Sequence, residues 1–172
     1  ASLMRNLYSR AEAVLGGAAP SEVSSLAAAD AMQTARHALT DWDDERFVAH
    51  AQLFYPSYWT NFSTDSHVRH ARLAESFNAG ERKLLIDFEI DDDNTSTILV
   101  VMAADHPGLF SRIVGAVAIA GCSIMNARIN TRHDGTILDQ FRIQNQNRQA
   151  VTDPQTQKRI SKTIEQLSLI HI

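Results

Sequence analysis

Two patterns of apolar positions divide the chain near residue 80. Before it, apolar residues recur every three or four positions in Ala-rich sequence, which predicts amphipathic helices. After it, short β-branched runs alternate apolar and polar residues or are apolar throughout, and helical stripes separate them. The pattern predicts a helical segment over 1–80 and a second domain over 81–172.

The helical segment carries recognisable start and stop signals. Gly16-Gly17 closes the first expected helix and Pro20 opens the second. Thr40 or Asp41 can cap the third, which should end before Pro56 because the residue before a proline disfavours helix. The expected helices cover residues 3–15, 20–40, 42–55 and 64–79.

Five aromatic residues fall within positions 54–62 of this segment. Large rings gathered between two helices are typical of a small core where helices meet, and we adopt that interpretation. An aromatic box that holds a ligand is the alternative.

The second domain is expected to contain four strands and two helices. Asp153 as cap and Pro154 at the first helical position open the last helix. Asp134-Gly135 predicts a hairpin turn because both residue types accept a positive φ. The strands are expected at 84–90, 97–103, 124–131 and 137–144, and the helices at 109–120 and 154–167.

The order of these elements predicts the fold. From residue 97 it reads β-α-β-β-α, one strand short of the sandwich in which two helices cover four antiparallel strands. The strand at 84–90 can supply the missing position, because the short turn at 91–94 makes it an antiparallel partner of 97–103. We therefore expect an α+β, ferredoxin-like domain whose fourth strand is permuted to the front.

Charge and composition exclude several functions. Lys and Arg number 16 and Asp and Glu 20, a formal charge of −4, without a basic run that would bind nucleic acid or an anionic membrane surface. No apolar stretch reaches the roughly 18 residues of a membrane span. The single cysteine, Cys122, excludes an internal disulfide and is expected to be a small buried thiol. We expect a cytoplasmic protein that binds neither nucleic acid nor membrane.

Seven histidines raise the question of a metal site. His67 and His70 lie one helical turn apart beside Asp65, but two ligands on one turn do not close a site. We expect partly exposed helix histidines and no metal. A metal hydrolase built on the histidines is the least supported alternative.

The turn before the 109–120 helix can bind a small ligand. Gly108 permits close backbone approach, Pro107 stiffens the turn, and the helix amides can hold a carboxylate. Asp105 can accept from an ammonium group, and Asn126 on the neighbouring strand offers a donor and an acceptor to a side-chain amide. The alternative is that Asp105 merely caps the helix. The candidate ligand-binding residues are Asp105, His106, Pro107, Gly108, Leu109, Ile124 and Asn126.

These residues resemble a known family. The run from Asp105 to Ile113, then Gly121, Ala127-Arg128-Ile129 and Asp134-Gly135, resembles an ACT domain. More narrowly, it is similar to the first ACT domain of the bifunctional uridylyltransferase/uridylyl-removing enzymes that modify the PII nitrogen-signalling protein. Residues 55–59 and 69–73 resemble the helical segment that precedes that domain.

The resemblance implies an allosteric role in nitrogen metabolism. In that family the ACT region senses glutamine and shifts the balance between attaching UMP to PII and removing it. The chain lacks the Gly-Ser loop with paired aspartates of a nucleotidyltransferase and the His-Asp ligand run of the hydrolase. We therefore expect a non-catalytic regulatory fragment without a cofactor, any divalent metal belonging to catalytic domains elsewhere.

Two differences from the family affect the expected site. The chain holds one ACT-like unit where the family has two, and Asn126 stands where an acidic residue is frequent. The ligand is expected to bind across a homodimer of ACT units. The alternative function is a structural dimerisation module that binds no small molecule.

Overall fold

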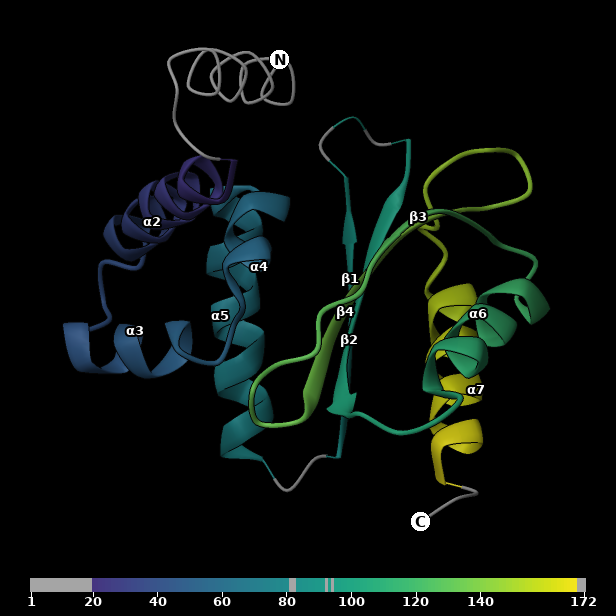
Figure 1. The fold of residues 1–172 in the computed structure, drawn as a ribbon. Coiled ribbons are helices and arrows are strands. Elements are labelled where there is room, and N and C mark those ends of the chain that lie inside the picture. Colours follow the sequence, from purple (N-terminus) through teal and green to yellow (C-terminus); the bar gives the residue numbers. More distant parts are fainter. Residues whose placement is uncertain (1–19, 81–82, 92, 94, 170–172) are drawn as a thin grey trace. The chain divides into compact units, whose positions relative to one another are not determined.

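A computed structural model of the chain describes residues 20–80, 83–91, 93 and 95–169 (Figure 1). The helix expected over 3–15 lies outside the described residues. The chain forms two compact units that divide between Arg72 and Leu73, within the helix that precedes the sheet. None of the helices in the described part is long and apolar enough to cross a membrane.

The first unit is helical. Asp43, and not the expected Thr40 or Asp41, caps the second of its described helices, where the Asp43 carboxylate accepts a 2.8 Å hydrogen bond from the Arg46 amide. Asp41 instead forms an ion pair with Arg72 on a helix distant in sequence, which local sequence does not predict. The helices of this unit are α2 (Pro20–Ala38), α3 (Asp44–Ala51), α4 (Pro56–Asn61) and the part of α5 (Thr64–Ala79) that precedes Leu73.

Four of the five aromatic residues of 54–62 form the core of this unit, as expected, whereas Tyr55 is 52% exposed. Tyr58 stacks on Phe54 with ring centroids 3.9 Å apart, and both are buried. The expectation of partly exposed histidines is wrong, because His67 is 2% and His70 0% exposed. His70 Nδ1 and the Tyr58 hydroxyl share a 3.1 Å hydrogen bond. The two histidines are core residues among these rings.

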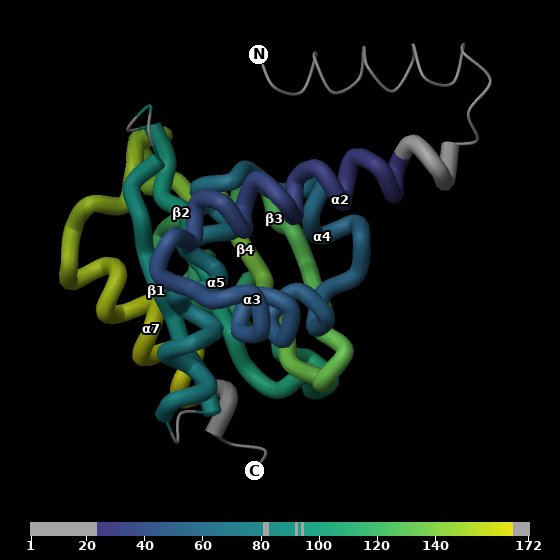
Figure 2. The backbone as a smooth tube through the Cα atoms, turned by 90° about the vertical axis from the view of Figure 1, so that its left-hand side faces the viewer, coloured from purple at the N-terminus to yellow at the C-terminus, as the bar shows by residue number. Residues whose placement is uncertain are grey.

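The second unit contains a four-stranded antiparallel sheet in the order β1-β2-β4-β3. β1 pairs with β2 along its whole length, from Leu84 opposite Ala103 to Ile90 opposite Thr97. Figures 1 and 2 show β1 and β3 at the two edges of the sheet. The permuted ferredoxin-like fold is confirmed. The strands are β1 (Leu84–Ile90), β2 (Thr97–Ala104), β3 (Ser123–Arg128) and β4 (Thr136–Gln144).

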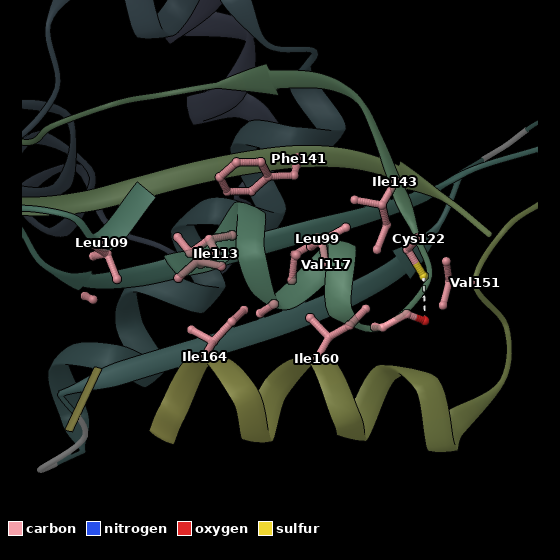
Figure 3. Packing of buried hydrophobic residues seen from close by; sticks show 14 of the residues in the cluster. Leu99, Leu109, Ile113, Val117, Cys122, Phe141, Ile143, Val151, Ile160 and Ile164 are labelled. Atoms are coloured by element: carbon pink, nitrogen blue, oxygen red, sulfur yellow. Dashed lines mark hydrogen bonds between the residues drawn. The ribbon is translucent and has the colours of Figure 1, made fainter. Parts of the chain in front are cut away.

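Helices α6 (Leu109–Ile119) and α7 (Pro154–Leu169) pack their apolar stripes on one face of this sheet. Figure 3 shows Ile113 of α6 and Ile160 of α7 pointing toward Phe141 and Ile143 of β4. Burial of each such side chain contributes about 1.5–3 kcal/mol. Packing against the sheet fixes the position of the first turn of α6, and therefore the position of the loop that precedes it.

The cap of α7 and the connection between β3 and β4 form where the sequence predicts them. Asp153 caps α7 by accepting from the Gln155 and Thr156 amides at 3.2 and 3.0 Å, as expected. In the β3–β4 connection, Gly135 has φ +77°, but Asp134 is not among the described residues with positive φ. The Asp134 carboxylate instead accepts from the Thr136 amide at 3.0 Å. β3 and β4 pair antiparallel across this connection, so the predicted hairpin is confirmed, although of Asp134 and Gly135 only the glycine has a positive φ.

Candidate ligand-binding site

The turn between β2 and α6 is built around Gly108. Gly108 has φ +82° and is the N-terminal cap residue of α6, without a side-chain capping bond. A Cβ atom added there would meet no atom within 4 Å, so the requirement for glycine comes from the backbone conformation and not from crowding. The turn therefore leaves open space beside the backbone at the helix start.

Asp105 does not cap α6, so the alternative role weighed for it is wrong. Its amide donates a 2.9 Å hydrogen bond to the Gly135 carbonyl, which ties the turn to the β3–β4 connection. The residue is exposed, as are Pro107 and Gly108, and His106 is half-buried. The carboxylate of Asp105 is therefore accessible to a ligand.

The start of α6 offers backbone donors. Within the described residues, the amides of Phe110 and Ser111 have no backbone acceptor, whereas the Leu109 amide donates to His106 at 3.2 Å. The Leu109 side chain is buried in the core, so only its backbone belongs to the site surface. Such free amides, with the positive end of the helix dipole, favour a carboxylate.

The other two candidate residues lie on β3, and a bulge separates them. Ile124 pairs with Ile143 and Asn126 with Arg142, so Met125 is an extra residue between adjacent pairs. Ile124 packs against the core beneath α6 and α7, whereas Asn126 shares the opposite face with Arg142. The two side chains therefore face opposite sides of the sheet.

Within one chain, the turn at residues 105–108 and the β3 residues Ile124 and Asn126 do not lie together. Ile124 pairs with Ile143, which pairs with Thr97 at the start of β2. Asp105 follows the end of β2, so a rise of about 3.3 Å per residue places it about 26 Å from the level of Thr97. The turn and the 124–126 segment therefore lie at opposite ends of the sheet.

Exposed apolar residues, which sequence reasoning missed, flank the β3 edge. Met125 is 58% and Ile129 50% exposed, and Phe110 and Ile119 of α6 are also exposed. The signal in the sequence was apolar residues at positions adjacent to inward-facing ones, but only the strand order shows that β3 is an edge. An open strand edge with apolar neighbours is a template for pairing with another chain.

Two ionisable groups near these elements have shifted pKa values. The pKa of Asp139 on β4 is raised to about 6, chiefly by burial; the hydrogen bond from the Asn130 amide opposes the shift and the charge of Asp105 adds to it. Burial, and then the charge of Arg142, lower the pKa of Arg128. Asp139 was not among the expected site residues, although an aspartate within an apolar strand run was a visible signal.

The described residues do not bring potential metal ligands together. In the described ranges no group of three or more His, Cys, Asp and Glu side chains is placed to bind an ion. His67 and His70 belong to the aromatic core of the helical unit. Cys122 is buried, and its thiol donates to the Ala120 carbonyl at 3.9 Å (Figure 3), so it is the small buried thiol expected.

The comparisons with known proteins bear on the sheet unit directly. A family model described as the ACT domain matches residues 96–167. Residues 96–167 form an ACT domain. The match begins after β1, and β1 nonetheless completes the four-stranded sheet of this ACT domain by pairing along β2.

The whole chain is also similar to larger enzymes. It is 38% identical over 171 residues to the bifunctional uridylyltransferase/uridylyl-removing enzyme of Gluconobacter oxydans, covering 96% of the chain and 18% of that enzyme. It is 39% identical over 144 residues to the enzyme of the same name from Azospirillum brasilense, covering 84% of the chain and 15% of that enzyme. The resemblance of the ACT domain and its helical segment to this enzyme family is confirmed. The chain spans less than a fifth of these relatives.

Proposed function

We propose that this chain is a non-catalytic regulatory region of a bifunctional PII uridylyltransferase/uridylyl-removing enzyme, and that its ACT domain senses L-glutamine. The similarity over nearly the whole chain to enzymes of that name supports the assignment to such an enzyme. Control of PII modification, and through it of cytoplasmic nitrogen signalling, is part of the proposal. We propose no cofactor for this chain, and any divalent metal belongs to the catalytic domains of the longer protein.

The observation that carries the ligand proposal is the glycine turn at the start of α6. Free amides at Phe110 and Ser111 suit the α-carboxylate of an amino acid, and the exposed Asp105 suits its α-ammonium group. Asn126 supplies the donor and acceptor that a glutamine side-chain amide requires. Together these groups match the three polar ends of glutamine.

A homodimer through β3 would unite the two halves of the site. Two β3 edges that pair antiparallel about a two-fold axis place the start of one strand beside the end of the other. The start carries Ile124 and Asn126. Beyond its end, Thr131 bridges to Ile137, which pairs with Ala103 next to the turn. The exposed Met125 and Ile129 would be covered by this pairing.

Calorimetric titration with L-glutamine tests the proposal, with L-glutamate, D-glutamine and L-isoleucine as controls. A thermal melt should accompany it, because a ligand at about 100 times its dissociation constant stabilises the fold by about 2.7 kcal/mol. Selective heat from L-glutamine is expected. The absence of any response to L-glutamine at saturating protein and ligand would contradict the sensor.

A structural dimerisation module is the second candidate, and the exposed apolar flanks of β3 favour it. Sedimentation of the same samples distinguishes the two functions. A dimer whose dissociation constant does not change with L-glutamine indicates the module, whereas a dimer tightened by L-glutamine indicates the sensor.

A further inference from the structure

Asp139 is a carboxylate in an apolar setting. It lies on β4 between Ile137 and Phe141 on the face that α6 and α7 cover, opposite Val101 of β2, and is 2% exposed. Ile113 of α6 and Ile160 of α7 are among the apolar residues that pack on this face. A buried carboxylate costs free energy unless hydrogen bonds compensate it, so its contacts indicate what it is for.

The contact of Asp139 is with the connection between β3 and β4. Its carboxylate accepts a 3.0 Å hydrogen bond from the Asn130 amide. Asn130 is held further by Leu138, whose amide donates to the Asn130 carbonyl at 2.8 Å and whose carbonyl accepts from Asn130 Nδ2 at 3.3 Å. Asp139 and its neighbour therefore fix the start of the connection.

The other end of this connection is hydrogen-bonded to the turn at residues 105–108, which we call the ligand turn. The Gly135 carbonyl accepts the Asp105 amide at 2.9 Å, and the Gly135 amide donates to the Arg132 carbonyl at 3.0 Å. The Arg132 amide donates to Thr136 at 2.7 Å. These hydrogen bonds, joined by the backbone between Asn130 and Arg132, thus connect Asp139 to the turn that begins at Asp105.

We infer that Asp139 is a positioning residue for the amino-acid site: by holding Asn130 it sets the β3–β4 connection, and with it the Asp105 turn, in the conformation that binds ligand. Only the identity of the ligand in this inference rests on the proposed function. The coupling between Asp139 and Asp105 is a property of the free protein and can be measured without ligand.

Protonation should adjust this link. The charged carboxylate accepts a stronger hydrogen bond from Asn130 than the neutral acid does. Burial raises the pKa of Asp139 to about 6; the hydrogen bond from the Asn130 amide opposes this shift and the Asp105 carboxylate adds to it. The connection should therefore be held best above pH 6, and ligand affinity should fall as the pH is lowered through that value.

Amide hydrogen exchange in the complete 172-residue chain tests the coupling without ligand. The variants are Asp139→Asn, which keeps an acceptor, and Asp139→Val, which removes it, with Glu165→Gln on the exposed face of α7 as the control. We expect the Asn130 and Asp105 amides to exchange about tenfold faster in Asp139→Val, less so in Asp139→Asn, and at the wild-type rate in the control. Faster exchange at Asn130 with an unchanged Asp105 amide would overturn the inference.

Titration with L-glutamine between pH 5 and 8 provides the second test. The wild-type affinity is expected to fall below pH 6, and the Asp139→Asn affinity to be about tenfold weaker at pH 7.5 and independent of pH. If Asp139 has only a structural role, Asp139→Asn should stabilise the fold, because it removes a buried charge. The affinity for L-glutamine should then be unchanged. Wild-type affinity and pH slope in Asp139→Asn would refute the positioning role. If the wild type binds no L-glutamine, the proposed function fails, and the exchange result still decides the coupling.

Discussion

Ile124 and Asn126 lie two residues apart on β3 but face opposite sides of the sheet, because the bulge at Met125 adds a residue between them. In a regular strand residues i and i+2 share a face. The bulge thus assigns Ile124 to the core and Asn126 to the opposite face of the sheet.

Substitution of these two residues should therefore have different consequences. We expect Ile124→Ala to lower the free energy of unfolding by about 2 kcal/mol, since it removes core contacts, while Asn126→Ala changes it by less than about 0.5 kcal/mol. Asn126→Ala should instead weaken L-glutamine binding. Urea denaturation and calorimetry measure the two effects, and equal destabilisation by both variants would show that the faces are assigned wrongly.

Replacement of Gly108 tests the ligand turn. Gly108→Val places a β-branched residue at φ +82° and should cost about 1–2 kcal/mol of stability and abolish L-glutamine binding. The matched control is Gly115→Ala within α6, where an added Cβ meets no atom within 4 Å and φ is not positive. That control should raise stability by about 0.5–1 kcal/mol and leave binding unchanged. Undiminished binding by Gly108→Val would move the site elsewhere.

The edge of β3 should govern association. Met125→Lys and Ile129→Lys place a charge at the exposed apolar flanks and should weaken dimerisation at least about tenfold, as measured by sedimentation equilibrium. Leu26→Lys, on α2, is the control because Leu26 is 70% exposed and lies in the helical unit. Weakened association should be accompanied by weaker L-glutamine binding. Dimers that persist in both β3 variants would exclude this edge as the interface.

Acid should destabilise the helical unit through His67. Burial lowers the pKa of His67 from 6.5 to about 4, so the unfolded chain binds a proton there between those pH values and the folded chain does not. The contribution of this group to stability is complete above pH 6.5 and is lost as the pH falls toward 4, by about 3 kcal/mol at about 1.4 kcal/mol for each pKa unit.

Thermal or urea unfolding of His67→Leu between pH 4 and 7 measures this contribution. The variant should lose less stability over the range than the wild type. His37→Gln, at an exposed position on α2, is the control and should retain the wild-type dependence. The same acid sensitivity in His67→Leu as in wild type would assign the effect to other groups.

The sequence by itself predicted the features that local chemistry controls. Glycine at 108, Asp153 before Pro154, and the short turn that makes 84–90 the partner of 97–103 each act over a few residues. Such signals are readable because capping, positive φ and the two-residue period of a strand depend on neighbours in the chain. The permuted fold and the position of the glycine turn before α6 followed from them.

Tertiary structure decided what depends on residues distant in sequence. Asp41 pairs with Arg72 and so leaves the capping role to Asp43, and two histidines expected on a helix surface are buried among aromatic rings. The bulge at Met125 sets the register of β3 by its pairing with β4. Burial and strand register are determined by packing across the whole unit. An amphipathic pattern therefore shows which residues share one face of a helix or strand, but not which residues pack against that face.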